Sequence, residues 1–477
     1  MPVAPFHPNV MTRAARRRAK HRAVATTGEM HEPAVPDDAS AAPRSPDPVA
    51  VMRSAAYLRL LVLAVLLGVP IAGLAFGFLG LTAAINGWTY TDLPRALGFS
   101  VTPLWWPLLP LAVAGLLVGC TVRYLPGRGG ESPAEGFHAG GPPKTSALPG
   151  VLLAALASVG LGAVVGPEAP LIALGGGLAV LAVRLGRRPV PAQAAAVVAA
   201  TGSFAAISTL LGSPLAGAFL LLEALSIGGT MATAVLLPGL LGAGVGALVF
   251  TGLGSITGIG TFSLAVPDLP PAGTPTVVEF GWALLAGLAA GPLCAGMRSL
   301  AIAARDRVVV RRPVRATVLL GLVIAGLAIG YAAATGHDVS DVLYSGQSTL
   351  PDLLTHSGTY SLGALLLLVL CKGLAYVASL SAFRGGPTFP AMFIGAAAGI
   401  ALSHLPGLGL IAGAAIGIGA VTAGMLRLPF TAVLLTTLFL GSDGFPVMPL
   451  TIVAVVVAYL TANLIAPPKP TPVAPTP

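Results

Sequence analysis

The chain has 477 residues, of which 55% are hydrophobic and only 9% are charged. Soluble domains carry about 25% charged residues, so a soluble globular protein is excluded. The formal net charge is +9, but the basic residues are dispersed, which does not fit a nucleic-acid-binding surface. The three cysteines have no paired spacing and the seven histidines are scattered. We therefore expect no structural disulfide, no metal site and no cofactor.

Residues 1–54 are rich in Pro, Ala, Arg and Asp and lack the apolar core of a signal peptide. Further arginines cluster near residues 184–188 and 298–315. Cytoplasmic segments of membrane proteins carry such an excess of basic residues. We therefore predict a disordered, basic cytoplasmic tail over residues 1–54, in a multi-pass protein of the cell membrane. A tail that binds RNA or lipid is the alternative.

Apolar segments of about 18 residues or more recur from residue 55 to residue 466. Continuous runs indicate helices, whereas a membrane β-barrel alternates apolar and polar residues. In chain order, the pattern predicts helices over 55–90, 103–123, 147–164, 170–186, 190–210, 214–227, 230–252, 276–304, 316–334, 361–381, 389–403, 408–424, 428–440 and 446–466. Several are too short to span a bilayer and many begin or end at Gly or Pro, which is typical of transporters built from broken helices. The predicted fold class is an all-α polytopic membrane protein.

The chain divides into two predicted membrane halves, 55–252 and 275–467, joined by a Gly-, Pro- and Thr-rich loop over 253–274. The stretch "GPEAPLIALGGG" in the first half matches "GGPTFPAMFIGAAAG" in the second, with a proline-bounded start followed by small residues. Small residues allow close helix packing. We predict two inverted-topology repeats of tilted and broken helices, although shared composition alone is an alternative explanation. A Pro-rich tail is expected over 468–477, with no soluble regulatory domain.

Glu168 is the only charged residue from Thr145 to Val183. It lies between two prolines, at the N-terminus of the helix predicted to start near Pro170. An ionised carboxylate is costly in a membrane, so it is usually functional or paired. A carboxylate at a helix N-terminus occupies the place of an anion, which makes Glu168 a candidate gate of an anion pathway. A purely structural helix cap is the alternative.

Four segments resemble, in order and spacing, the CLC chloride channels and chloride/proton antiporters. "GAVVGPEAPLIALGGG" is similar to the family's Gly-Arg-Glu-Gly-Pro helix start, with Pro167 and Ala169 in place of the usual Arg and Gly. "GGESP" precedes it, where the family has Gly-Ser-Gly-Ile-Pro. The stretches "SPLAGAFLLLEAL" and "CKGLAYVASLSAFRGGPTFPAMFIGAAAG" resemble two later elements. No motif is intact, but together they cover roughly residues 55–467. The resemblance implies a homodimer in the lipid bilayer, with a pathway for chloride or a similar anion in each subunit.

The resemblance also implies an anion site. Its candidate residues are Gly129, Gly130, Ser132, Gly166, Ala169, Gly386, Thr388 and Phe389. Two hydroxyl donors of the family are absent, because Gly130 stands where the family has a serine and no tyrosine follows Tyr459. Ser132 and Thr388 are candidate replacements. Pro167 and Pro387 also lack a backbone N–H. Because both hydroxyl donors are missing, we expect the site to bind anions weakly.

Antiporters of the resembled family carry a second glutamate on the cytosolic side. Glu223 matches the first of two adjacent glutamates in that helix, and Ala224 stands at the second, the usual internal proton acceptor. We therefore expect proton coupling to be weak or absent, with Glu223 as the candidate residue of any proton pathway. A helix-end acid facing Arg187 and Arg188 is the alternative interpretation of Glu223.

Three other polar residues are not expected to form the anion site. Lys372 matches a family lysine and is either a buried cation beside the pathway or a side chain that snorkels to the interface. His337 and Asp341 are expected in an aqueous loop.

Competing functions lack the residues they need. An integral membrane enzyme would require a Ser–His pair, paired aspartates or a His-Glu-x-x-His motif on a membrane helix. A carrier that binds a cation at Glu168 would require a partner set of Asn, Thr and carbonyl groups. We therefore predict a non-enzymatic transporter of chloride-like anions, with a proton-coupled antiporter as the alternative.

Overall fold

The computed structural model describes residues 52–136, 144–185, 192–225, 229–258, 266 and 269–465. The predicted C-terminal tail, nearly all of the predicted N-terminal tail and part of the loop over 253–274 lie outside these ranges. Within them the chain is helical and contains no strand. Eight of the described helices are long and apolar enough to cross a membrane. The predicted fold class is confirmed.

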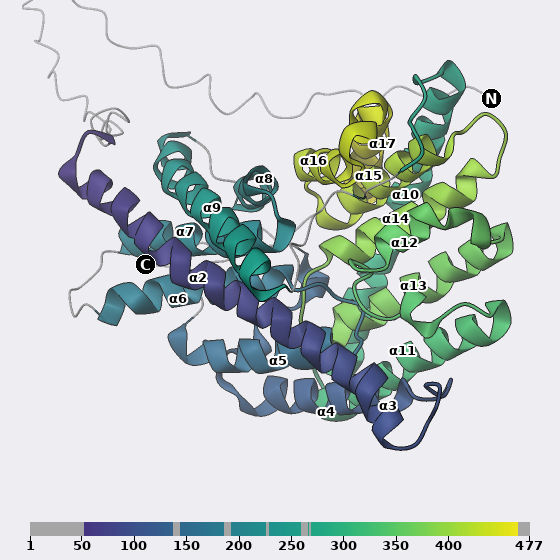
Figure 1. Ribbon diagram of the computed structural model, residues 1–477, viewed down its shortest axis with the longest axis horizontal. Helices are drawn as coiled ribbons and strands as arrows, with labels where there is room; N and C mark the ends of the chain where they lie inside the picture. The colour runs from purple at the N-terminus through teal and green to yellow at the C-terminus, as the bar shows by residue number, and fades with distance from the viewer. Residues whose placement is uncertain are drawn as a thin grey trace, which may run out of the picture. The chain divides into compact units, whose positions relative to one another are not determined.

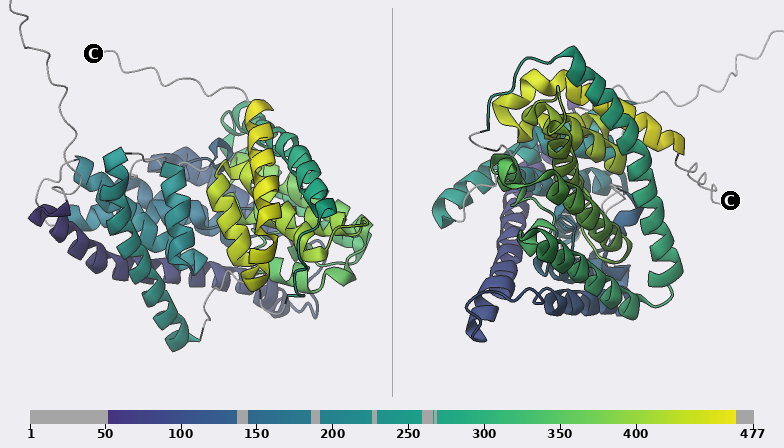
Figure 2. Two further views of the ribbon diagram at one scale, coloured as in Figure 1. Left: turned by 90° about the horizontal axis from the view of Figure 1, so that it is seen from above. Right: turned by 90° about the vertical axis from the view of Figure 1, so that its right-hand side faces the viewer.

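The helices of the first half are α2 (Ala55–Gly87), α3 (Leu93–Ala96), α4 (Leu108–Tyr124), α5 (Leu148–Gly160), α6 (Glu168–Leu185), α7 (Ala192–Leu211), α8 (Pro214–Leu225) and α9 (Gly229–Thr257). Those of the second half are α10 (Val277–Ala304), α11 (Pro313–Thr335), α12 (Leu350–Thr355), α13 (Leu362–Ala382), α14 (Thr388–Ser403), α15 (Leu410–Leu426), α16 (Pro429–Phe439) and α17 (Gly444–Ile465). In Figures 1 and 2 the first half, purple to teal, lies beside the second, green to yellow.

The two halves repeat one pattern of helix packing. In the first half α6 packs on α7, and α9 packs on α2, α7 and α8. In the second half α14 packs on α15, and α17 packs on α10, α15 and α16. The halves meet where α4 packs on α11 and α8 packs on α16. This correspondence of α2–α9 with α10–α17 is the two-repeat architecture expected from the sequence.

Prolines and a capping box set several helix starts. Proline occupies the first position of α8, α11 and α16, where its missing N–H has no intrahelical acceptor anyway. The hydroxyl of Thr276 accepts a hydrogen bond from the N–H of Glu279, whose carboxylate accepts one back from the N–H of Thr276. This capping box satisfies two donors at the start of α10.

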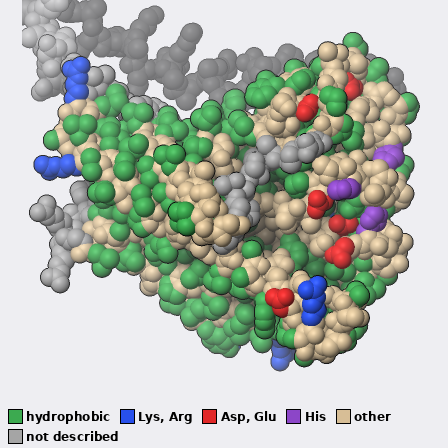
Figure 3. Space-filling model, in the orientation of Figure 1, with side chains coloured by type: hydrophobic (Ala, Val, Ile, Leu, Met, Phe, Trp, Pro, Cys, Tyr) green, Lys and Arg blue, Asp and Glu red, His purple; other side chains and the backbone are tan. Residues whose placement is uncertain are grey.

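Several helices are too short to span a bilayer, and two of them, α14 and α15, are almost completely buried among the others. At 1.5 Å per residue, the 12 residues of α8 cover about 18 Å. Every residue of α15 is buried except its first, and nearly all of α14 is buried as well. The exposed large hydrophobic side chains lie mostly on the longer helices, such as α2, α10 and α11. The face drawn in Figure 3 is accordingly mostly hydrophobic, and its acidic and histidine side chains gather at the right.

Glycines allow close approach between paired helices. A Cβ added at Gly175 of α6 would lie 2.5 Å from the carbonyl oxygen of Gly202 in α7. The second half uses the same device, because Gly395 and Gly399 of α14 face the backbone of Gly417 and Gly413 in α15. The predicted role of the small-residue runs is confirmed at these two contacts.

The α6–α7 contact generates a stability prediction. Gly175→Ala should lower the thermal unfolding midpoint of the detergent-solubilised protein, because the new methyl group overlaps α7 backbone, an overpacking that costs about 1–3 kcal/mol. The matched control is Gly281→Ala in α10, where an added Cβ meets no atom within 4 Å. Equal midpoints for the two variants would contradict this account of the packing.

Candidate functional site

The loop before α6 pairs with the loop before α14. The N–H of Gly166 donates to the carbonyl oxygen of Gly386 at 2.8 Å, and the N–H of Gly386 donates to the carbonyl oxygen of Gly166 at 2.5 Å. Together they form an isolated antiparallel bridge. Each glycine stands two residues before the first residue of its helix, so the bridge brings the starts of α6 and α14 together.

Two buried serines hold the same loops across the two halves. Ser158 of α5 accepts a hydrogen bond from the N–H of Arg384, and Ser379 of α13 accepts one from the N–H of Val164, both at 3.0 Å. Each hydroxyl also donates to a carbonyl one turn earlier in its own helix. The reciprocal pattern is what a twofold-related pair of repeats produces. Sequence analysis did not single out these serines.

Glu168 is fully buried and bonds to the opposite half of the chain. Its Oε1 accepts a hydrogen bond of 3.1 Å from the backbone N–H of Phe389, at the start of α14. Its Oε2 has no hydrogen-bond partner, and neither does the buried hydroxyl of Thr388. The sequence placed Glu168 correctly at the first turn of α6, but its carboxyl group also caps α14. Sequence spacing could not reveal this contact, because 221 residues separate the two partners.

The two bridging glycines provide the space for this carboxyl group. A Cβ at either Gly166 or Gly386 would overlap the carboxyl oxygens of Glu168. Both glycines were predicted as anion-site residues, and the structure places them against the side chain of Glu168. Any larger residue at these positions would have to displace the carboxyl group.

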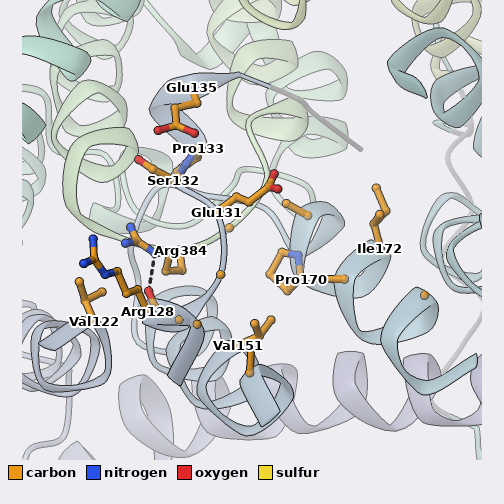
Figure 4. Close-up of a pocket in the computed structure, with 18 of the residues that line it drawn as sticks. Val122, Arg128, Glu131, Ser132, Pro133, Glu135, Val151, Pro170, Ile172 and Arg384 are labelled. Carbon is orange, nitrogen blue, oxygen red and sulfur yellow. Dashed lines mark hydrogen bonds between the residues drawn. The ribbon is translucent and has the colours of Figure 1, made fainter. Parts of the chain in front are cut away.

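A cavity of about 1510 Å³ opens beside this site. Its walls come from the segment 126–136, the first turns of α6, parts of α7 and the segment 384–387. In Figure 4, Arg128, Ser132 and Arg384 lie on one side of it, and Pro170 and Ile172 lie on the other. Ala169, next to Glu168, and Pro387, next to Thr388, also line it. The cavity therefore reaches the residue next to Glu168.

The charged residues of the cavity wall are mainly basic. Two of its acidic groups, those of Glu135 and Asp306, form ion pairs with Arg305, with N–O distances of 2.6 and 2.8 Å. Such a wall attracts small anions. The basic residues are Arg123, Arg128, Lys144, Arg305, Arg311 and Arg384, and the acidic ones are Glu131, Glu135 and Asp306.

The eight predicted anion-site residues fall into two groups. Gly129, Gly130, Ser132 and Ala169 line the cavity. Gly166, Gly386, Thr388 and Phe389 are buried around the carboxyl group of Glu168. The Oγ atom of Ser132 is buried without a hydrogen-bond partner, so it is available as a donor in the cavity wall.

One hydroxyl group near the site was missed from the sequence. Tyr376 of α13 is fully buried, and its hydroxyl donates to the carbonyl oxygen of Pro387 at 2.8 Å. A tyrosine two to three turns before Gly385 and Gly386, in an otherwise apolar helix, was the only available signal. The bond fixes the turn from which α14 starts.

Glu223 is held at the start of another helix. Its carboxylate accepts hydrogen bonds from the N–H of Phe430 at 3.0 Å and from the N–H and hydroxyl of Thr431 at 2.8 and 2.6 Å. These groups belong to the first turn of α16. The structure therefore shows Glu223 as a helix-capping acid, while Arg187 and Arg188 lie outside the described residues.

Lys372 is a buried cation that does not line the cavity. Its Nζ donates to the carbonyl oxygens of Asp341, Val342 and Leu343 at 2.8, 3.3 and 3.1 Å, and it lies 4.1 Å from the centre of the Phe393 ring. Snorkelling is excluded, because its side chain is fully buried. Lys372 instead fastens the loop before α12 to α13 and α14.

The sequence suggested that Asp341 lies in an aqueous loop, but the structure shows that it is buried. It is 8% exposed, and its carboxylate accepts hydrogen bonds from the hydroxyls of Tyr331 and Tyr360. Burial raises the pKa of the Asp341 carboxyl group, and these hydrogen bonds partly oppose the rise. His337 stacks on the Tyr360 ring with a centroid separation of 4.1 Å. Asp341 is thus packed inside the protein, whereas His337 is half-buried and the neighbouring Asp338 is exposed.

Comparisons with known proteins agree with this geometry. The putative ion-transport protein YfeO of Escherichia coli (strain SE11) is 27% identical over 358 residues, which cover 74% of this chain and 81% of that protein. A slow cyanobacterial Cl⁻/H⁺ antiporter has a similar fold, with a TM-score of 0.69 at 20% identity, covering 85% of this chain and 95% of that one. A CLC-type fluoride/proton antiporter aligns with a TM-score of 0.62 at 20% identity, covering 86% and 96% of the two chains.

The family comparison covers most of the membrane region. Residues 114–463 match the family described as voltage gated chloride channel. That span is well over half of the chain and contains the bridge, Glu168 and the basic cavity. The protein therefore belongs to the voltage gated chloride channel family, as the resemblance in its sequence indicated.

Proposed function

We propose that the protein transports chloride or a similar small anion across the membrane and that Glu168 gates the pathway. The observation that carries this proposal is the position of its carboxyl group. It accepts a hydrogen bond from the N–H of Phe389, beside a mainly basic cavity. The family consists of channels and transporters, so membership does not support the alternative function of an integral membrane enzyme.

Gating follows from competition for one place. Helix N-termini bind anions through unpaired N–H groups and the positive end of the helix dipole. The carboxylate of Glu168 and a transported anion therefore exclude each other at the start of α14. Neutralising the carboxyl group removes the charge that holds it against Phe389, and an anion from the cavity can then take its place.

Coupling to protons is proposed to be weak or absent. Ala224 cannot carry a proton, and Glu223 is held by three hydrogen bonds from the start of α16. To relay a proton toward another group, the carboxyl group of Glu223 would have to break these hydrogen bonds and leave the start of α16. A proton-coupled antiporter that uses water in place of Ala224 is the alternative.

The membrane arrangement is proposed on charge and exposure. The excess of basic residues on the cavity side favours a cytoplasmic N-terminus and a cavity that opens to the cytoplasm, in the cell membrane.

The helices α8, α16 and α17 expose Phe219, Phe430 and Phe445, which are 45%, 73% and 62% accessible. We propose that a homodimer forms through this surface, as the family resemblance implies, with one pathway in each subunit.

The gate is tested by neutral substitution. Glu168→Gln and Glu168→Ala should raise chloride efflux from proteoliposomes, because neither side chain competes with the anion as a charge. Both variants should elute from a size-exclusion column as wild type does, which shows that they are folded. Lower flux through well-folded protein would show that Glu168 is a structural cap.

Proton coupling is tested by imposing a chloride gradient on proteoliposomes and recording external pH. We expect chloride to move without uphill proton movement, because the internal proton acceptor is replaced by Ala224. Uphill proton movement that disappears in Glu168→Gln would refute this expectation. Glu223→Gln would then show whether Glu223 serves as the inner proton station.

Anion binding is tested by calorimetric titration with chloride in the Glu168→Gln background. Binding should be weak, and Thr388→Val should weaken it by a further factor of about 10, because a hydrogen bond to a charged group contributes about 1.5–3 kcal/mol. The matched control is Thr422→Val, which removes a buried, unpartnered hydroxyl in α15, outside the candidate anion site. Equal effects of the two substitutions would remove Thr388 from the anion site.

A further inference from the structure

The loop before α6, residues 161–167, leads directly to Glu168 and is buried except at Leu161, which is half-buried. Its later residues are held by the glycine bridge and the serine contact described above. None of the loop residues lines the cavity. The position of Glu168 therefore also depends on what holds the other end of the loop, at Leu161 and Gly162.

The first contact at that end comes from Tyr90, in the π-helical turn Trp88–Asp92 between α2 and α3. Its hydroxyl donates to the carbonyl oxygen of Leu161 at 3.0 Å, although 71 residues separate the two. Gly162 has a positive φ of 107°, and a Cβ on it would lie 2.7 Å from the hydroxyl oxygen of Tyr90. Glycine at this position thus permits the turn and leaves room for the tyrosine hydroxyl.

The second contact comes from the opposite half of the chain. The N–H of Tyr344 donates to the carbonyl oxygen of Gly162 at 3.2 Å, and its ring packs edge-on against the Tyr90 ring with a centroid distance of 5.5 Å. Tyr344 has a φ of 58°, which is uncommon for a residue other than glycine. Such a conformation persists where the surroundings impose it, and Lys372 binds the carbonyl oxygens of the three preceding residues.

The turn that carries Tyr90 is itself fixed to the segment before α4. The indole N–H of the buried Trp106 donates to the carbonyl oxygen of Thr89 at 3.0 Å. The hydroxyl of Thr102 donates to the carbonyl oxygen of Tyr90, also at 3.0 Å. With its backbone fixed on one side and its ring packed against Tyr344 on the other, Tyr90 can determine where the loop lies.

We propose that Tyr90 is a positioning residue for the gate, which holds the far end of the loop so that the carboxyl group of Glu168 meets the N–H of Phe389. The inference rests on the proposed function of Glu168. Without the tyrosine hydroxyl, the carbonyl group of Leu161 loses its partner and the start of α6 can shift. The carboxyl group then occupies its place less often, and anions pass more often. Tyr90 does not line the cavity, so its effect reaches the anion only through the loop.

Chloride efflux from proteoliposomes is measured for wild type, Tyr90→Phe, Glu168→Gln and the double variant. Tyr90→Phe should raise efflux about fivefold, a factor typical of the loss of one hydrogen bond. In the Glu168→Gln background the same substitution should change efflux less than about twofold, because no carboxylate remains to be misplaced.

The matched control is Thr102→Val, which removes a hydrogen bond of the same length from the same segment without touching the loop. It should match wild type, and all variants should elute from a size-exclusion column as wild type does. An equal factor for Tyr90→Phe in the two backgrounds, or lower efflux, would overturn the inference. The gate proposal stands in that case as long as Glu168→Gln still raises efflux.

Absence of chloride efflux in wild type would reject the proposed function instead. Hydrogen exchange followed by mass spectrometry then tests the positioning role without transport. Exchange over residues 161–168 should be about fivefold faster in Tyr90→Phe than in wild type, because the loop opens more often, while exchange over α15 should be unchanged. Unchanged exchange over residues 161–168 would refute the role of Tyr90.

Discussion

The pair of backbone hydrogen bonds between Gly166 and Gly386 is the contact on which the site depends. It joins two loops from opposite halves and brings the starts of α6 and α14 together. Only glycine leaves room beside the bridge for the Glu168 carboxyl group. The reciprocal serine contacts then fix both loops to helices of the other half. The proposed gate therefore depends on the interface between the repeats, because residues of both halves form it.

Charged side chains in this protein are satisfied largely by backbone groups. Glu168 and Glu223 accept from N–H groups at the starts of α14 and α16, whereas Lys372 donates to successive carbonyl groups. Backbone dipoles help to stabilise each of these charges, and Lys372 also lies near the buried carboxylate of Asp341. They also leave the cavity wall with an excess of positive charge that is available to anions.

The two glutamates differ in the number of hydrogen bonds that hold their carboxyl groups. Glu223 is fixed by three hydrogen bonds, two of them from N–H groups and one from a hydroxyl. Glu168 has one bond from Phe389, and its second oxygen has none. A carboxyl group with an oxygen that has no well-aligned partner is held less firmly than one with both oxygens bonded. The contrast agrees with a movable gate at Glu168 and a fixed cap at Glu223.

The sequence by itself determined the membrane class, the broken helices, the two repeats and the position of Glu168 at a helix start. These features are local, because hydropathy, prolines and glycines act on the segments that contain them. Only the tertiary structure decided which helix Glu168 caps, since Phe389 is 221 residues away. It likewise corrected Asp341, placed Lys372 away from the cavity and revealed Ser158, Ser379, Tyr376 and Tyr90. Each of these roles depends on a partner from a distant segment, and composition and spacing carry no record of that proximity.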